Sequence, residues 1–238
     1  RRVLFRSKKI IGDLLTPSDV VVLVTPIDSS APKGRMILPQ MQTIRDILDN
    51  YAICIVTQTE QLAGALNALK KPPKMVITDS QAFSKVKEIV PESILLTSFS
   101  ILFARYKGVI ETTCKGAASI EKLNDGDIVL ISEGCTHHRQ CKDIGTVKLP
   151  DWIKKYTGKQ LHFEFTSGGE FMEDLSIYSL IVHCGGCMLN EREVRYRQKC
   201  AEDAEIPFTN YGTIIAYMNG ILERSLQAFP ELMKRIDI

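Results

Sequence analysis

Three cysteines and two histidines form a split pattern that constrains the chemistry of this chain more than any other feature. The pattern consists of Cys135-Thr-His137 and, much later in the chain, His183-Cys184-Gly-Gly-Cys187. Thiolate and imidazole side chains are common ligands of zinc and of iron in proteins. Two tight groups of such residues therefore predict a bound metal ion or an iron–sulfur cluster.

Both groups come directly after an apolar run that is predicted to form a strand. Cys135 follows the run 127–132, and Cys184 follows the run 178–183. In open α/β sheets, ligands bind in the crevice at the carboxyl ends of the strands. The two loops can therefore close on one metal centre if the two strands are neighbours in the sheet.

The residues around the Cys-x-x-Cys motif suit a cluster-binding loop. The pair Gly185-Gly186 allows the backbone to bend so that both cysteines of the motif face the same centre. Asn190 followed by Glu193 resembles a capping box and predicts a helix over about 190–204. The free N–H groups at the start of that helix would face the negative charge of a thiolate-ligated cluster.

The number of ligands separates the possible metal sites. A structural zinc ion needs four ligands, which the three cysteines and one of the two histidines would supply. A cubane cluster on the three cysteines would leave one iron with a non-cysteine or exchangeable ligand. The candidates for that position are Glu133, His137 and His183, with Cys141 a weaker choice. Either histidine could instead orient a loop or donate a hydrogen bond to sulfur.

Other interpretations of the cysteines remain open at this stage. Cys184 and Cys187 lie between a predicted strand and a predicted helix, which is also the layout of a thioredoxin-like dithiol oxidoreductase. The remaining cysteines of interest, Cys54, Cys114 and Cys200, lie within predicted strands or helices and are interpreted as small packing residues.

Composition places the chain among soluble globular proteins. Of its 238 residues, 45% are hydrophobic and 24% are charged, and the formal net charge of +2 does not indicate a nucleic-acid partner. The odd count of seven cysteines fits a reducing cytoplasm better than a secreted disulfide framework. No apolar run approaches the roughly 20 residues that span a bilayer, so we expect no membrane segment.

The order of apolar and amphipathic segments predicts an α/β fold. From about Asp19, short Val/Ile-rich runs alternate with amphipathic stretches, and strands without polar alternation are typical of a parallel sheet covered by helices. We expect two small doubly wound, Rossmann-like parallel-sheet domains, 8–107 and 108–238. The second is expected to carry the iron–sulfur site at the carboxyl ends of its strands and to finish with a long helix over about 210–229.

With these residues in view, the chain resembles the HydF family, the scaffold proteins of [FeFe]-hydrogenase maturation. The pattern Cys-x-His followed by His-Cys-x-x-Cys is similar to the C-terminal signature of that family. The segments 25–39 and 132–137 also resemble the family's middle domain and its cluster loop. The resemblance covers essentially all of residues 8–238.

The resemblance implies a scaffold or carrier without catalytic activity of its own. The first domain would form a homodimer, and the second would hold a [4Fe-4S] cluster on Cys135, Cys184 and Cys187 with an exchangeable fourth ligand. Proteins of this family are thought to receive a diiron precursor with CO, cyanide and bridging dithiolate ligands, made with the maturases HydE and HydG. They would then deliver the precursor to the apo-hydrogenase HydA.

One feature of the family is missing from this sequence. HydF proteins carry an N-terminal GTPase domain, but this chain contains no Gly-x-x-x-x-Gly-Lys-Ser/Thr motif. The loop 25–35, which follows the first predicted strand, also lacks that arrangement. We therefore expect no GTP site in this chain.

Overall fold

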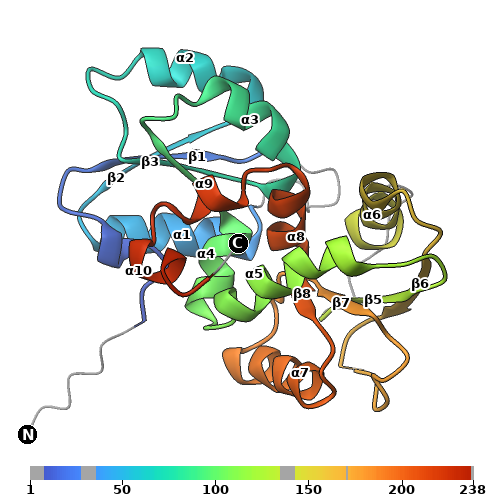
Figure 1. Ribbon diagram of the computed structural model, residues 1–238. Coiled ribbons are helices and arrows are strands. Elements are labelled where there is room, and N and C mark those ends of the chain that lie inside the picture. Colours follow the sequence, from blue (N-terminus) through green and yellow to red (C-terminus); the bar gives the residue numbers. More distant parts are fainter. Residues whose placement is uncertain (1–7, 28–35, 135–142, 170, 237–238) are drawn as a thin grey trace, which may run out of the picture.

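The computed structural model describes residues 8–27, 36–134, 143–169 and 171–236. Within them the chain forms two α/β units that lie side by side, each built on a parallel sheet with flanking helices (Figure 1). The predicted fold class, two doubly wound parallel-sheet units, is confirmed.

The two sheets share one topology among the described residues. The first contains β1 (Val20–Val24), β2 (Ile53–Thr57), β3 (Met75–Thr78) and β4 (Leu95–Ser98), in the order β2-β1-β3-β4. All of its strand pairs are parallel. The central strands β1 and β3 consist mostly of buried Val, Ile, Leu and Met side chains, because helices cover both faces of the sheet.

The second sheet repeats this arrangement. Its strands are β5 (Ile128–Ser132), β6 (His162–Thr166), β7 (Leu180–His183) and β8 (Phe208–Asn210), in the order β6-β5-β7-β8. These pairs are also parallel. In both units the first and third strands therefore lie at the centre of the sheet.

Helices connect the strands. The first unit has α1 (Leu38–Asp49), α2 (Leu62–Asn67), α3 (Phe83–Ile89), α4 (Phe99–Tyr106) and the short turns η1 (Gly12–Leu14), η2 (Thr59–Gln61) and η3 (Ser80–Ala82). The second unit and the C-terminal segment have α5 (Ile110–Ala118), η4 (Ser119–Lys122), η5 (Ile144–Lys148), α6 (Leu149–Thr157), α7 (Glu191–Asp203), α8 (Tyr211–Met218), α9 (Leu222–Leu226) and α10 (Pro230–Met233). No helix in the described ranges is long and apolar enough to cross a membrane.

Local sequence explains where two of these helices begin and end. The α6 helix has Pro150 in its first turn and ends at Gly158, whose φ of 67° is in the left-handed region that glycine adopts readily. The α7 helix begins as predicted, because the side chain of Asn190 accepts a hydrogen bond from the N–H of Glu193 at 2.8 Å.

The C-terminal segment differs from its prediction. The expectation of one long helix over 210–229 is wrong. Asn210 ends the edge strand β8, which pairs with β7, and its side chain caps α8 through the N–H of Thr213. The helix then stops near Gly220, which has a φ of 64°, and the chain turns into α9.

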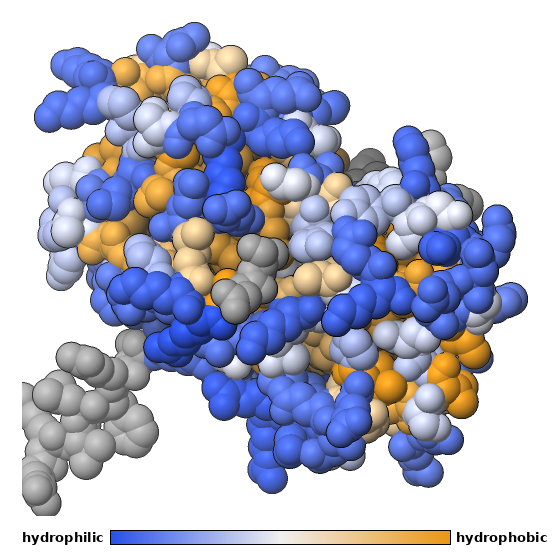
Figure 2. Space-filling model, viewed as in Figure 1, coloured by the Kyte–Doolittle hydropathy of each residue, from blue (hydrophilic) through white to orange (hydrophobic). Residues whose placement is uncertain are grey.

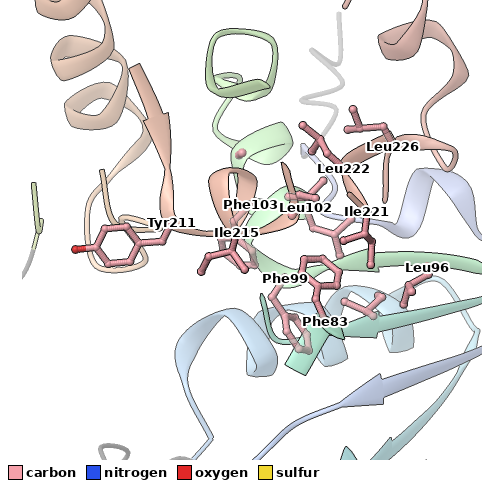
Figure 3. Packing of buried hydrophobic residues seen from close by; sticks show 14 of the residues in the cluster. Phe83, Leu96, Phe99, Leu102, Phe103, Tyr211, Ile215, Ile221, Leu222 and Leu226 are labelled. Carbon is pink, nitrogen blue, oxygen red and sulfur yellow. The ribbon is translucent and has the colours of Figure 1, made fainter. Parts of the chain in front are cut away.

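One apolar cluster extends through both units. Phe83, Phe99 and Phe103 of the first unit belong to the same cluster as Ile215 and Ile221 of the C-terminal segment (Figure 3). The α9 helix packs against β4, so the end of the chain returns to the first unit. Hydrophilic side chains cover much of the outer surface in Figure 2, including the part formed by α7 at the bottom of that view.

Candidate iron–sulfur site

The candidate site lies at the carboxyl ends of β5 and β7. These strands are parallel neighbours, and Ser132 at the end of β5 is paired with His183 at the end of β7. The chain leaves β5 toward one edge of the sheet and leaves β7 toward the other, which makes this a topological switch point. A metal centre shared by the two loops requires these strands to be neighbours, and the structure meets this condition.

The sulfur of Cys184 is held by backbone N–H groups from both loops. It accepts hydrogen bonds from Gly134 at 3.1 Å and from Gly186 at 3.3 Å. Burial raises the pKa of the Cys184 thiol, while these two N–H groups act in the opposite direction by stabilising the thiolate. A metal ion that displaces the proton would thus find a sulfur whose negative charge is already solvated by the protein.

Gly186 gives the Cys-x-x-Cys loop its shape. Its φ of 59° is in the left-handed region, and an added Cβ would lie 3.1 Å from Cγ2 of Val194. The N–H of Leu189 closes the turn by donating to the carbonyl of Gly186 at 3.0 Å. Gly185, by contrast, has open space where a Cβ would point. The loop therefore needs glycine at 186, and partly buried Cys187 follows directly.

His183 is buried and both of its ring nitrogens have partners. Nδ1 lies 2.6 Å from the carbonyl oxygen of Cys184, and Nε2 lies 3.4 Å from Nη1 of Arg197. Since a carbonyl only accepts, Nδ1 carries the proton and Nε2 accepts from the guanidinium. Burial, followed by the positive charges of Arg197 and Lys107, lowers the pKa of His183 to about 4. The imidazole is therefore neutral at pH 7 and orients the loop that begins at Cys184.

Arg197 is a member of this site that the sequence did not indicate. Its side chain is fully buried, donates to Glu193 at 2.8 Å and to the carbonyl of Gly168 at 2.9 Å, and lies over the ring of Phe171. The Glu193–Arg197 spacing alone is typical of an exposed ion pair on a helix. The burial of Arg197 follows from the packing of α7 against the loop after β6.

Glu133 lies buried at the end of β5, one residue before Gly134. The hydroxyl of Tyr211 donates to its Oε1 at 3.2 Å. An added Cβ on Gly145 would lie 2.5 Å from the same oxygen, so the backbone approaches the carboxyl closely at this point. Burial, followed by the charge of Glu133, raises the pKa of Tyr211, which keeps its hydroxyl protonated as a donor.

Lys107 is a second buried cation that the sequence did not single out. Its ammonium group donates to the carbonyls of Gly186 and Leu189, and the latter bond is 3.1 Å long. Burial lowers the pKa of Lys107, while Cys187, Cys184 and Glu191 act in the opposite direction. In the sequence this lysine marks only the predicted boundary between two domains.

Several predicted site residues lie outside the described residues: Cys135, His137 and the weaker candidate Cys141. Within the ranges that the structure describes, no three His, Cys, Asp or Glu side chains form a group that could hold a metal ion. The predicted convergence of three cysteines therefore stays a prediction.

The described residues fit a thiolate-ligated cluster. The partly buried sulfur of Cys184 accepts hydrogen bonds from two backbone N–H groups, and the charges of a buried carboxylate and of a buried ammonium group act on it. Iron–sulfur clusters are commonly surrounded by N–H donors to sulfur and by nearby charges. The dithiol interpretation fits less well, because Cys184 is partly buried and α7 begins only at Glu191.

Two protein-family profiles match this chain. The profile of the hydrogen maturase F dimerization domain matches residues 10–108, and that of the hydrogen maturase F tetramerization domain matches residues 111–228. A comparison with curated proteins found no match. Together the two profiles span nearly all of the described chain, including both parts of the candidate site, and the chain belongs to the hydrogen maturase F (HydF) family.

Proposed function

We propose that this chain is a scaffold and carrier in [FeFe]-hydrogenase maturation, which holds a diiron precursor beside an iron–sulfur cluster. Its family supports a role in assembling the hydrogenase cofactor. The observation that carries the proposal is the hydrogen bond from the N–H of Gly134 to the sulfur of Cys184. Since Cys135 follows Gly134 in the sequence, the loops that bear the first and second cysteine groups meet at this bond.

The proposed ligands of a [4Fe-4S] cluster are Cys135, Cys184 and Cys187. Such a cluster, when bound, would supply one iron with an exchangeable coordination position. Both nitrogens of His183 already have protein partners, which argues against His183 as the fourth ligand; Glu133 and His137 are the other two candidates. An oxygen or imidazole ligand leaves iron more readily than a thiolate, and a carrier needs that exchange.

The remaining parts of the proposal concern assembly. We propose a cytoplasmic homodimer in which 8–107 forms the dimerisation domain and 108–238 the cluster-binding domain. The two matched domain names, dimerization and tetramerization, support association between copies of the chain. HydE and HydG would load the diiron precursor with its CO, cyanide and dithiolate ligands, and HydA would receive it.

Anaerobic reconstitution with iron and sulfide tests the cluster. The wild-type chain should bind about four iron atoms and give an EPR signal that changes when cyanide or imidazole is added. Cys184→Ala should lose the iron, whereas the control Cys200→Ala, which changes a cysteine in the last turn of α7, should keep it. Stoichiometric zinc without iron in anaerobically purified protein, or a signal indifferent to cyanide and imidazole, would overturn the proposal.

A further inference from the structure

The chain crosses from the first unit to the second at Lys107 and Gly108, beside the candidate site. Lys107 follows α4, and Gly108 has a φ of 73°. An added Cβ on Gly108 would lie 2.2 Å from the guanidinium of Arg195. Arg195 in turn donates to the carbonyl of Lys107 at 3.2 Å. The junction between the units is therefore packed against α7, the helix that follows the Cys-x-x-Cys motif.

The side chain of Lys107 continues from this junction into the Cys-x-x-Cys loop. Only 5% of the residue is exposed, and its ammonium group donates to the carbonyls of Gly186 and Leu189. Those two residues are joined by their own backbone hydrogen bond, which closes the loop turn. Lys107 thus connects both ends of that turn to the first unit.

A deeply buried ammonium group is stabilised by negative charge nearby, because burying an unpaired charge is strongly unfavourable. Its two hydrogen-bond acceptors are neutral carbonyl groups. The acidic side chain that influences the pKa of Lys107, Glu191, already pairs with Lys8 at 2.9 Å and with Arg195 at 3.0 Å. The other side chains that act on Lys107 are Cys187 and Cys184, which would carry negative charge as thiolates once they bind metal.

We propose that Lys107 is a positioning residue of the cluster site, which fixes the 184–189 loop through two carbonyls and supplies a positive charge to the thiolates. The inference rests on the proposed function, because the charge acts on a cluster that the thiolates would hold. A cluster gains a negative charge when it is reduced, and a buried cation stabilises that state. The first unit would then take a direct part in a site whose thiolates belong to the second.

Two substitutions separate the two roles. Lys107→Gln removes the charge but keeps a hydrogen-bond donor, and Lys107→Met removes both. The matched control is Lys87→Met, because Lys87 also belongs to the first unit and donates to a carbonyl of the C-terminal segment, that of Asn219 at 3.1 Å, away from the site. Circular dichroism of each variant establishes that it is folded.

The first readout is amide hydrogen exchange of residues 184–190 in the iron-free protein. Lys107→Met should speed exchange in this loop about tenfold, as expected from the loss of one or two net hydrogen bonds. Lys107→Gln should change it less, and Lys87→Met should leave it at the wild-type rate. Wild-type exchange in Lys107→Met would overturn the positioning role.

The second readout is the midpoint potential of the reconstituted cluster, which a merely structural role would not move in a consistent direction. Lys107→Gln and Lys107→Met should both shift the potential to more negative values, whereas Lys107→Arg, which keeps the charge, should stay near wild type. Equal potentials in all variants would overturn the charge role. Failure of the wild type to assemble any cluster would instead refute the proposed function, and the exchange measurement on the iron-free chain would still test the positioning role.

Discussion

Buried polar side chains form hydrogen bonds that fix the conformation at the ends of β5 and β7. Arg197 donates to Nε2 of His183, and Nδ1 of His183 donates to the carbonyl of Cys184. This chain of hydrogen bonds fixes the imidazole tautomer and the direction in which the backbone enters the Cys-x-x-Cys loop. In metal sites such outer partners orient the ligands. The guanidinium of Arg197 therefore acts on Cys184 through His183.

Replacing Arg197 with methionine should destabilise the protein strongly. The substitution leaves buried acceptors at Gly168 and His183 without a donor, and we expect the free energy of unfolding to fall by about 3 kcal/mol. The control is Lys199→Met on the same helix. Lys199 forms an ion pair with Asp203 at the same spacing, but both side chains are about two-thirds exposed, so Lys199→Met should leave the free energy of unfolding close to the wild-type value.

Urea denaturation of the iron-free protein measures both changes. Equal losses in the two variants would mean that the buried position of Arg197 contributes nothing beyond an ordinary helical ion pair.

Only part of this site could be predicted from the sequence, because the rest depends on tertiary packing. A cysteine directly after a Val/Ile-rich run can be recognised in the sequence, and Cys184 was therefore correctly placed at the end of a strand. Arg197 and Lys107 acquire their roles only when α7 and the junction between the units pack against the loop. The hydrogen bond from Tyr211 to Glu133 joins residues far apart in the chain, so no local sequence pattern could predict it.

Among the helices and strands, the sequence predicted those whose formation depends on residues close together in the chain. Periodicity located the strands from β1 to β7, and the Asn190 cap located the start of α7. It did not locate β8, because Phe208–Asn210 is short and joins the sheet only through its pairing with β7. The break after α8 was also missed, since a single glycine within an apolar pattern is compatible with a continuous helix.

Alanine substitutions at two glycines test how this break is encoded. Gly220 has a positive φ and open space around its Cα, so Gly220→Ala should cost about 1 kcal/mol through backbone strain alone. Gly64 lies within α2, also with open space, and Gly64→Ala should stabilise the protein by about 0.5 to 1 kcal/mol. Thermal unfolding followed by circular dichroism should show opposite shifts. Shifts of the same sign would contradict this account of the turn.

The first unit exposes apolar side chains on α1 and β2 that suit self-association. We name this the α1–β2 patch; its residues are Met41 and Leu48 of α1, Tyr51 of the turn that follows, and Ile53 and Val56 of β2. The β2 strand is also an edge strand, with backbone groups open to a neighbour. Exposed apolar patches and unprotected edges commonly mark interfaces. The patch is therefore our proposed surface for pairing two copies of the chain.

A charge placed in the α1–β2 patch should prevent that pairing. Leu48→Glu would bury an unpaired carboxylate at the interface, and we expect the dimer to dissociate into monomers. Light scattering coupled to size-exclusion chromatography gives the mass of each species. Ile177→Glu is the control, because Ile177 is similarly exposed but lies in the second unit. A dimer that survives Leu48→Glu would place the interface elsewhere.

The whole molecule contains two sheets of the same strand order; one large apolar cluster includes residues of both units, and a smaller cluster lies within the second unit. No internal repeat is detectable in the sequence, since a shared topology requires only similar patterns of strands and helices. Nor did the sequence show that α9 would return to β4, because that contact joins the end of the chain to its first half. The two units therefore have separate sheets but share the larger apolar cluster.

A continuous core predicts that the two units unfold together. Leu222→Ala removes a buried side chain where α9 packs against β4 of the first unit, and should lower the free energy of unfolding by about 2 to 5 kcal/mol. The single tryptophan, Trp152, lies in α6 of the second unit, so its fluorescence reports on that unit alone. Far-UV circular dichroism reports on both units.

If unfolding is one cooperative transition, Leu222→Ala should move the urea midpoints of fluorescence and circular dichroism by the same amount. Ile177→Ala, which changes an exposed side chain, should leave both midpoints within about 0.5 kcal/mol of wild type. A Trp152 midpoint that stays fixed while the dichroism acquires an earlier step would show that the units unfold separately. Lys107 would then join two units that are stable independently. Coincident midpoints would instead mean that a substitution that destabilises the first unit also destabilises the Cys-x-x-Cys loop through the shared apolar cluster.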